Sequence, residues 1–280
     1  MGYVLEYGAY GLLVVVALVV LVWVFVRIQE RWGIFHPWSY EENWLLEVEE
    51  RYPDREAVEI ETADGLTLRG LWRQGEPEAP AIVLFQGNAG NITGREWWLE
   101  LVPPEGWSAL IFDYRGYGRS EGSPSEPGLY RDVEAVVDFV EERTSGADLY
   151  YHGRSLGTVM ASRAAFHKQP AGIILDSGFP DAVSMSRTIL PIPRIEKMLN
   201  VELNTLEHLR QAEEEWGEIR KFVIHGRADQ IVPFYLGERL YEEISPPKES
   251  WFVEGAGHNN LVQVAGEENY AREIRKFLEP

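Results

Sequence analysis

Short apolar runs alternate with stretches of helical periodicity along most of the chain. Residues 57–72 predict a hairpin that turns near Asp64-Gly65. Six short apolar runs follow, each of strand length, at residues 81–87, 109–114, 148–153, 172–179, 221–227 and 250–256. Stretches between and after them place apolar residues at helical spacing, at residues 94–102, 129–143, 156–167, 233–244 and 269–278. This alternation predicts an α/β fold, with a mostly parallel sheet covered by helices on both faces.

One interval departs from this alternation. About 40 residues separate the runs at 172–179 and 221–227, and their first part is apolar and contains Pro191 and Pro193. An insertion above the carboxyl ends of strands is well placed to cover a pocket. We therefore predict a short lid at about residues 180–218, within a catalytic domain that spans 56–280.

The N-terminal region contains an apolar run without a charged residue. Gly8–Val26 has 19 such residues, which as a helix would extend roughly 28 Å, close to the hydrocarbon thickness of a bilayer. A cleaved signal peptide normally begins with basic residues, whereas Glu6 is the only charge before this run. A core helix normally has a polar side. The pattern favours a transmembrane anchor over residues 1–28, followed by a juxtamembrane segment over 29–55.

The charges around this run predict its orientation. Arg27 and Arg31 follow the run directly, and no Lys or Arg precedes it. Basic residues tend to remain on the cytoplasmic side. We expect a single-pass protein in the lipid bilayer, with its catalytic domain in the cytoplasm.

Composition and charge restrict the possible partners. The 280 residues are 45% hydrophobic and carry a formal net charge of -19, which argues against binding to a nucleic acid. The acidic balance is typical of a solvated surface, and a halophilic source or a cationic substrate would also explain it. The chain has no cysteine, which excludes thiol nucleophiles and disulfides. The Gly-rich segment 115–122 lacks a phosphate-loop pattern, so no nucleotide is expected.

The strongest chemical motif lies where a predicted strand meets a predicted helix. Gly153-Arg154-Ser155-Leu156-Gly157 follows the apolar run 148–153 and precedes the helical stretch 156–167. A sharp Gly-x-Ser-x-Gly turn exposes its serine above a sheet, where an adjacent base can activate it. The alternative is a serine that only caps a helix.

Two later residues supply the acid and the base in the order that this motif requires. Asp229 and His258 each follow a predicted strand, so both are expected at the same edge of the sheet as Ser155. His258 would accept the serine proton, and Asp229 would orient the imidazole. Asp176, which also ends a strand, is a second candidate for the acid. Asp113 is expected to organise its own loop through Arg115 or Arg119.

Acyl transfer also needs donors for a tetrahedral oxyanion. The backbone N–H groups of Leu156 and Asn88 are the candidates, since Leu156 follows the serine and Asn88 lies after the run 81–87. A plain turn is the alternative for the segment around Asn88. The histidines show no metal-ligand spacing, so neither a metal nor a cofactor is expected.

With these residues identified, the chain resembles the α/β-hydrolase superfamily. The resemblance rests on "GNAGN", "DYRGYGRSEG", "GRSLG", "HGRADQIVP" and "GAGHNN", which occur in this order within residues 57–280. Within the superfamily, the chain most resembles the membrane-anchored bud-emergence type, which is related to the depalmitoylating α/β-hydrolase-domain proteins. The resemblance implies an eight-stranded, mostly parallel sheet, with Ser155 as nucleophile, Asp229 as acid, His258 as base, and Asn88 and Leu156 as oxyanion donors.

One residue departs from the pattern of these relatives. They usually carry His before the glycine of the oxyanion loop, where this chain has Gln86. The Gln86 amide could still hold the loop by hydrogen bonding, so the change bears on substrate preference more than on catalysis.

The sequence thus predicts a membrane-anchored serine hydrolase. It would cleave carboxylic esters or thioesters through an acyl-enzyme, as an esterase, lipase or thioesterase does. The anchor and the apolar lid favour acyl-chain substrates, such as lipid esters, lysophospholipids or S-acylated proteins. A small-molecule carboxylesterase, an aminopeptidase-like hydrolase and a non-catalytic membrane scaffold are the alternatives.

Overall fold

The structure is a computed structural model of the chain. It describes residues 10, 13–14, 16–25, 34–41, 43–101, 103–189, 197 and 199–279.

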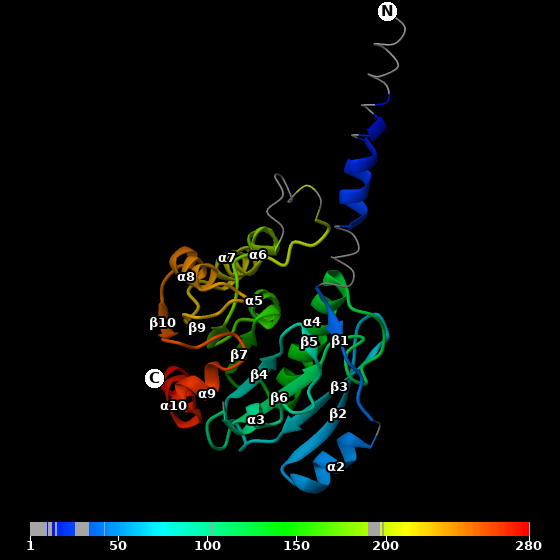
Figure 1. The fold of residues 1–280 in the computed structure, drawn as a ribbon. Coiled ribbons are helices and arrows are strands. Elements are labelled where there is room, and N and C mark those ends of the chain that lie inside the picture. Colours follow the sequence, from blue (N-terminus) through cyan, green and yellow to red (C-terminus); the bar gives the residue numbers. More distant parts are fainter. Residues whose placement is uncertain are drawn as a thin grey trace, which may run out of the picture.

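Within the described residues, eight strands form one sheet (Figure 1). From one edge to the other they are β10 (Lys248–Val253), β9 (Lys221–Gly226), β8 (Gly172–Asp176), β7 (Leu149–Arg154), β4 (Ala81–Phe85), β6 (Ser108–Asp113), β3 (Thr67–Arg73) and β2 (Arg55–Glu61). β3 is antiparallel to both of its neighbours, and the other pairs are parallel. The predicted hairpin and the mostly parallel sheet are confirmed. A short parallel pair, β1 (His36–Pro37) and β5 (Ala89–Gly90), lies apart from this sheet.

The central strands are apolar at successive positions because each has helices on both faces. In β4, Val83 belongs to one core cluster, whereas its neighbours Ile82 and Leu84 belong to the other. Side chains alternate between the two faces of a sheet, so a strand buried on both faces needs apolar residues throughout. This explains the continuous apolar runs of the sequence.

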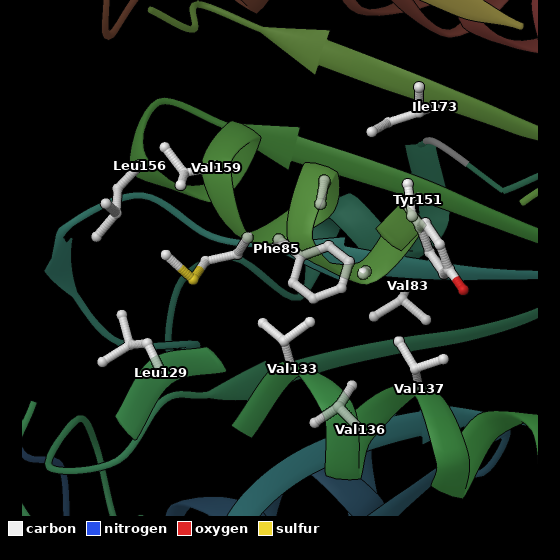
Figure 2. Close-up of a cluster of buried hydrophobic side chains, with 14 of the residues drawn as sticks. Val83, Phe85, Leu129, Val133, Val136, Val137, Tyr151, Leu156, Val159 and Ile173 are labelled. Carbon is white, nitrogen blue, oxygen red and sulfur yellow. The ribbon is translucent and has the colours of Figure 1, made fainter. Parts of the chain in front are cut away.

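Among the described residues, five helices contribute buried residues to the first core cluster and four to the second; α6 (Ala182–Ile189) contributes only Ala182 to the first. The first cluster contains residues from α4 (Glu126–Arg143), α5 (Leu156–His167), α7 (Thr205–Trp216) and α8 (Phe234–Glu243). The second contains residues from α2 (Trp44–Arg51), α3 (Trp97–Leu101), α9 (Leu261–Ala265) and α10 (Glu267–Leu278). Figure 2 shows Val133 and Val137 of α4 directed toward Val83 and Phe85 of β4. This packing holds α4 against the centre of the sheet.

The interval predicted as a lid contains two described helices with different environments. α6 (Ala182–Ile189) buries Ala182 and Ser184 near its start, and it ends in Ile189, which is exposed. α7 instead packs against α5 and buries Leu209 and Ala212 in the core. Residues 205–216 therefore belong to the helical layer over the sheet, and only residues 180–204 remain candidates for a lid. Of these, 190–196 and 198 lie outside the described residues.

The predicted membrane anchor is only partly described. Residues 16–25 are helical and exposed, and they include Leu21 and Phe25. Within the described part of the chain, no helix is both long enough and apolar enough to cross a membrane. Residues 8–9, 11–12, 15 and 26 of the predicted span lie outside that part, as do Arg27 and Arg31.

Candidate active site

Ser155 lies on a strained turn between β7 and α5. Its backbone has φ 55° and ψ -119°, a conformation that costs energy for a residue with a Cβ atom. The flanking glycines make this turn possible because the backbones approach closely. A Cβ atom at Gly153 would lie 2.1 Å from the carbonyl oxygen of Gly157, and one at Gly157 would lie 1.9 Å from that of Phe85. The turn therefore has the geometry that the Gly-x-Ser-x-Gly pattern predicts.

Asp229 and His258 come together although 28 residues separate them in the sequence. His258 Nδ1 lies 2.7 Å from Asp229 Oδ2. An ionised carboxylate only accepts hydrogen bonds, so Nδ1 carries the proton and Nε2 is left as an acceptor. Asp229 Oδ1 accepts the N–H groups of Ile231 and Val232, each at 2.9 Å. Asp229 is thereby fixed in place and orients the His258 ring.

His225 lies beside this pair. Its Nε2 is 2.9 Å from the carbonyl oxygen of Val232 and 3.4 Å from Asp229 Oδ2. Burial lowers the pKa of His225, so this ring is neutral at neutral pH. His225 therefore supports the loop that carries Asp229 without neutralising the carboxylate.

Ser155 and His258 line one cavity of about 160 Å³. Gly87 and Asn88 of the predicted oxyanion loop line the same cavity. A Cβ atom at Gly87 would lie 3.5 Å from the Cβ atom of Ser155, so the loop lies directly against the serine. Leu156 is the first residue of α5, where a backbone N–H has no acceptor within the helix. The structure thus brings the sequence-predicted residues to one edge of the sheet.

Gln86 holds the loop that carries Gly87 and Asn88. Its Nε2 donates to the carbonyl oxygen of Phe112 at 3.0 Å and to Asp113 Oδ1 at 2.9 Å, and its Oε1 accepts from Arg95. Gln86 is only 1% exposed. A buried amide with partners on both of its polar atoms restricts the movement of the loop.

Asp113 also holds the loop that carries Gly87 and Asn88, and Arg115, one of its two expected partners, does not contact it. Its Oδ1 accepts from Gln86 and from the N–H of Ile92. Arg115 instead pairs with Asp132 and Asp64. Burial raises the pKa of Asp113 to about 7, although the Gln86 and Ile92 hydrogen bonds oppose the shift.

Asp176, the second candidate for the acid, has other partners. Its Oδ2 accepts from the Tyr270 hydroxyl at 2.8 Å, and its Oδ1 accepts from the Ser177 hydroxyl at 2.8 Å. His152 Nε2 lies 3.9 Å from Oδ2. Asp176 therefore belongs to a buried polar group below the site, whereas Asp229 contacts His258.

Two arginines at the cavity have roles that sequence reasoning did not find. Arg154 donates to the carbonyl oxygen of His258, which links the serine turn to the histidine loop. Arg95 donates to Gln86 Oε1 and to the carbonyl oxygen of Ala89. The position of Arg154 inside the Gly-x-Ser-x-Gly motif was a signal for its role, whereas nothing in the sequence around Arg95 distinguishes it from a surface arginine.

Comparisons with known proteins agree with this architecture. The model of the alpha/beta hydrolase fold family matches residues 80–194. An uncharacterised protein of Mycobacterium tuberculosis is 32% identical over 225 residues, which cover 79% of this chain and 78% of that protein. Human alpha/beta hydrolase domain-containing protein 17B is 28% identical over 257 residues, which cover 84% of this chain and 82% of that protein.

A solved structure shares the fold. An esterase of Pyrococcus furiosus superposes with a TM-score of 0.68 at 21% sequence identity, over 89% of this chain and 97% of the esterase. The family match and the relative that is 32% identical over 79% of the chain indicate one family, and the strand order and the serine turn agree with it. The chain belongs to the α/β-hydrolase superfamily.

Proposed function

We propose that the protein is a serine hydrolase that cleaves carboxylic esters or thioesters through an acyl-enzyme. Ser155 is the nucleophile, His258 the general base and Asp229 the residue that orients it. One observation carries the proposal: the 2.7 Å contact between His258 and Asp229 lies next to the strained Ser155, and Ser155 and His258 line one cavity.

The reaction follows from these positions. Ser155 Oγ attacks the acyl carbonyl carbon while His258 Nε2 takes the hydroxyl proton. The N–H groups of Asn88 and Leu156 stabilise the oxyanion that forms. Collapse of this intermediate breaks the bond to the alcohol or thiol, which leaves with the proton from His258. Water then attacks the acyl-enzyme by the same route and releases the acid.

We also propose a membrane anchor and acyl-chain substrates, such as lipid esters, lysophospholipids or S-acylated proteins. The described helical residues 16–25 are apolar and exposed, which supports contact with lipid. A second groove of about 410 Å³ shares Trp97, Arg154 and Asn259 with the serine cavity and offers room for a chain. These features are compatible with the bud-emergence type of the superfamily.

The size of the serine cavity favours a second candidate, a small-molecule carboxylesterase. A volume of about 160 Å³ is below the roughly 300–1,000 Å³ of most ligand pockets. A series of p-nitrophenyl esters of increasing acyl length separates the two candidates. Rising kcat/KM with length supports acyl-chain substrates, and a maximum at acetate supports the small-ester alternative.

Labelling with a fluorophosphonate probe tests the mechanism. The wild-type protein should be labelled, and Ser155→Ala should not, because the probe reacts only with an activated serine. Asp229→Asn should lower kcat by about 10⁴, since the orientation and tautomer of the histidine depend on the carboxylate.

Ser162→Ala is the matched control, because Ser162 lies on α5 and its hydroxyl bonds the carbonyl oxygen of Thr158, away from the cavity. This variant should be labelled like the wild type. Labelling that persists in Ser155→Ala, or a wild-type protein that is never labelled, would falsify the proposed mechanism.

A further inference from the structure

The cavity at Ser155 is lined by positively charged side chains that ester hydrolysis itself does not require. Arg95 and Arg154 both line it. Among the described residues that form its walls, none is Asp or Glu. The whole chain has a formal net charge of -19, so a wall with two arginines and no carboxylate stands in contrast to the rest of the molecule.

The hydrogen bonds of the two arginines go to neutral groups. Arg95 donates to the Gln86 amide oxygen and the Ala89 carbonyl oxygen, and Arg154 donates to the His258 carbonyl oxygen. Neither guanidinium forms an ion pair with a carboxylate of the described residues. Both side chains are held in place with no carboxylate in direct contact, and the buried Asp113 and Asp176 act on them only through longer-range electrostatics. Guanidinium groups with free N–H donors facing a cavity are the arrangement expected of an anion site.

The two positive charges also influence each other. Burial and the neighbouring charge of Arg154 together lower the pKa of Arg95, although Asp113 opposes this. An arginine nevertheless stays protonated in proteins. A bound anion would relieve this repulsion between the guanidinium groups.

The two acidic side chains that interact electrostatically with these arginines, Asp113 with Arg95 and Asp176 with Arg154, have their hydrogen bonds with other groups. Asp113 accepts hydrogen bonds from Gln86 and Ile92, and Asp176 accepts from Tyr270 and Ser177. Asp113 and Asp176 lie buried beneath the cavity and do not line it.

The adjoining groove has a different charge. Glu100 and Glu267 line it beside Arg154, which the groove shares with the serine cavity, and Glu100 pairs with Arg55. The positive charge is therefore concentrated at the serine, where the scissile carbonyl would lie.

We propose that the cavity selects esters that carry a negative charge, a phosphate or a carboxylate, a few atoms from the scissile carbonyl. This inference rests on the proposed hydrolysis at Ser155 and names its substrate class. Guanidinium groups bind both anions through paired N–H donors, and Arg154 uses only one of its five donors on the His258 carbonyl. A cationic substrate, which the acidic composition left open, does not fit this wall.

Paired substrates test the inference on the full chain. Lysophosphatidic acid and monoacylglycerol with the same acyl chain differ only in the phosphate. We expect kcat/KM to be about 10- to 100-fold higher for lysophosphatidic acid than for monoacylglycerol. This ratio corresponds to the free energy that a hydrogen bond to a charged group contributes. A p-nitrophenyl hemiester of a dicarboxylic acid, compared with the neutral ester of equal length, tests a carboxylate on the acyl side. The pair with the larger ratio identifies the anion, and both ratios should fall as sodium chloride is raised.

Substitutions separate charge from structural support. Arg154→Gln and Arg95→Gln should lower the ratio of anionic to neutral kcat/KM, and the corresponding Lys variants should keep part of it. Arg131→Gln removes an exposed arginine that pairs with Asp64 and should leave the ratio unchanged. A purely structural role would lower kcat/KM for both substrates of a pair equally.

Each outcome decides between the proposals. Equal kcat/KM for charged and neutral esters, with no effect of salt on the ratio, would overturn the anion site and leave the serine mechanism intact. A protein that hydrolyses neither substrate and takes no fluorophosphonate label overturns both. If a Gln variant does not fold, two other measurements decide whether the cavity selects anions. They are the salt dependence of the anionic-to-neutral kcat/KM ratio in the wild type, and the same ratio in the Lys variants.

Discussion

At the scale of single residues, Gln86 shows how a departure from a family pattern can be accommodated. Its amide donates to Phe112 and Asp113 and accepts from Arg95, so both of its polar atoms have partners. These bonds hold the loop that leads to Asn88. This arrangement buries the Asp113 carboxyl, which is fully enclosed, and burial raises its pKa to about 7.

Asp113 should make the stability of the protein depend on pH. Its pKa is 3.8 when unperturbed and about 7 in the folded protein, so the folded state holds more protons between these values. The free energy of unfolding should therefore fall as pH rises from about 4 to 7, by at most about 1.4 kcal/mol per pH unit from this group. Asp113→Asn should remove that contribution. Chemical denaturation at several pH values measures it.

The exposed Asp54 provides the control for this comparison. Asp54→Asn removes an exposed carboxylate that does not contact the loop around Gln86, and its stability is measured over the same pH range. Asp113→Asn should gain stability relative to the wild type with rising pH. A constant difference across this range would show that Asp113 is ionised in the folded protein.

At the scale of elements, a carboxylate joins α4 to the segment that precedes α7. Glu126, the first residue of α4, accepts the N–H groups of Glu202 at 2.8 Å and Leu203 at 2.6 Å. A negative charge is favourable at a helix N-terminus. The contact fixes the end of the interval 180–204, where Leu203 has a φ of 35°.

Glu126→Ala should release this segment. Hydrogen bonds to charged groups contribute about 1.5–3 kcal/mol, so the free energy of unfolding should fall by about that amount or more. Limited proteolysis should also cut faster within residues 199–204. Glu142→Ala removes an exposed carboxylate from the same helix and serves as the control. Equal cleavage rates in both variants would mean that Glu126 does not hold the segment.

The elements themselves were largely predictable. The strands and the hairpin follow from apolar runs and a turn signal, which are local features. The extent of the lid was not predictable, because an amphipathic pattern does not say against which element a helix packs. α7 packs against α5 and buries Leu209 and Ala212 in the core, which is a contact between segments far apart in sequence.

At the scale of the whole molecule, an acidic domain is joined to an apolar N-terminal segment. The net charge of -19 opposes contact with anionic surfaces, whereas the exposed apolar residues 16–25 favour contact with lipid. Binding to a membrane would therefore rest on the apolar segment and would resist salt.

Vesicle sedimentation tests the proposed anchor. The full chain should sediment with phosphatidylcholine vesicles at both low and high salt, because burial of apolar surface is not screened. A chain that lacks residues 1–33 should remain in the supernatant and still react with the fluorophosphonate probe. A full chain that stays in the supernatant would argue against the anchor.

The sequence by itself determined the fold class and the order of Ser155, Asp229 and His258, because turn chemistry and strand periodicity are local properties of the chain. Only the tertiary structure decided that Asp229, and not Asp176, contacts His258, and that Arg95 lines the serine cavity. These contacts depend on the order of strands in the sheet and on loops that meet across it. Packing between distant segments sets that arrangement, and no local pattern records it.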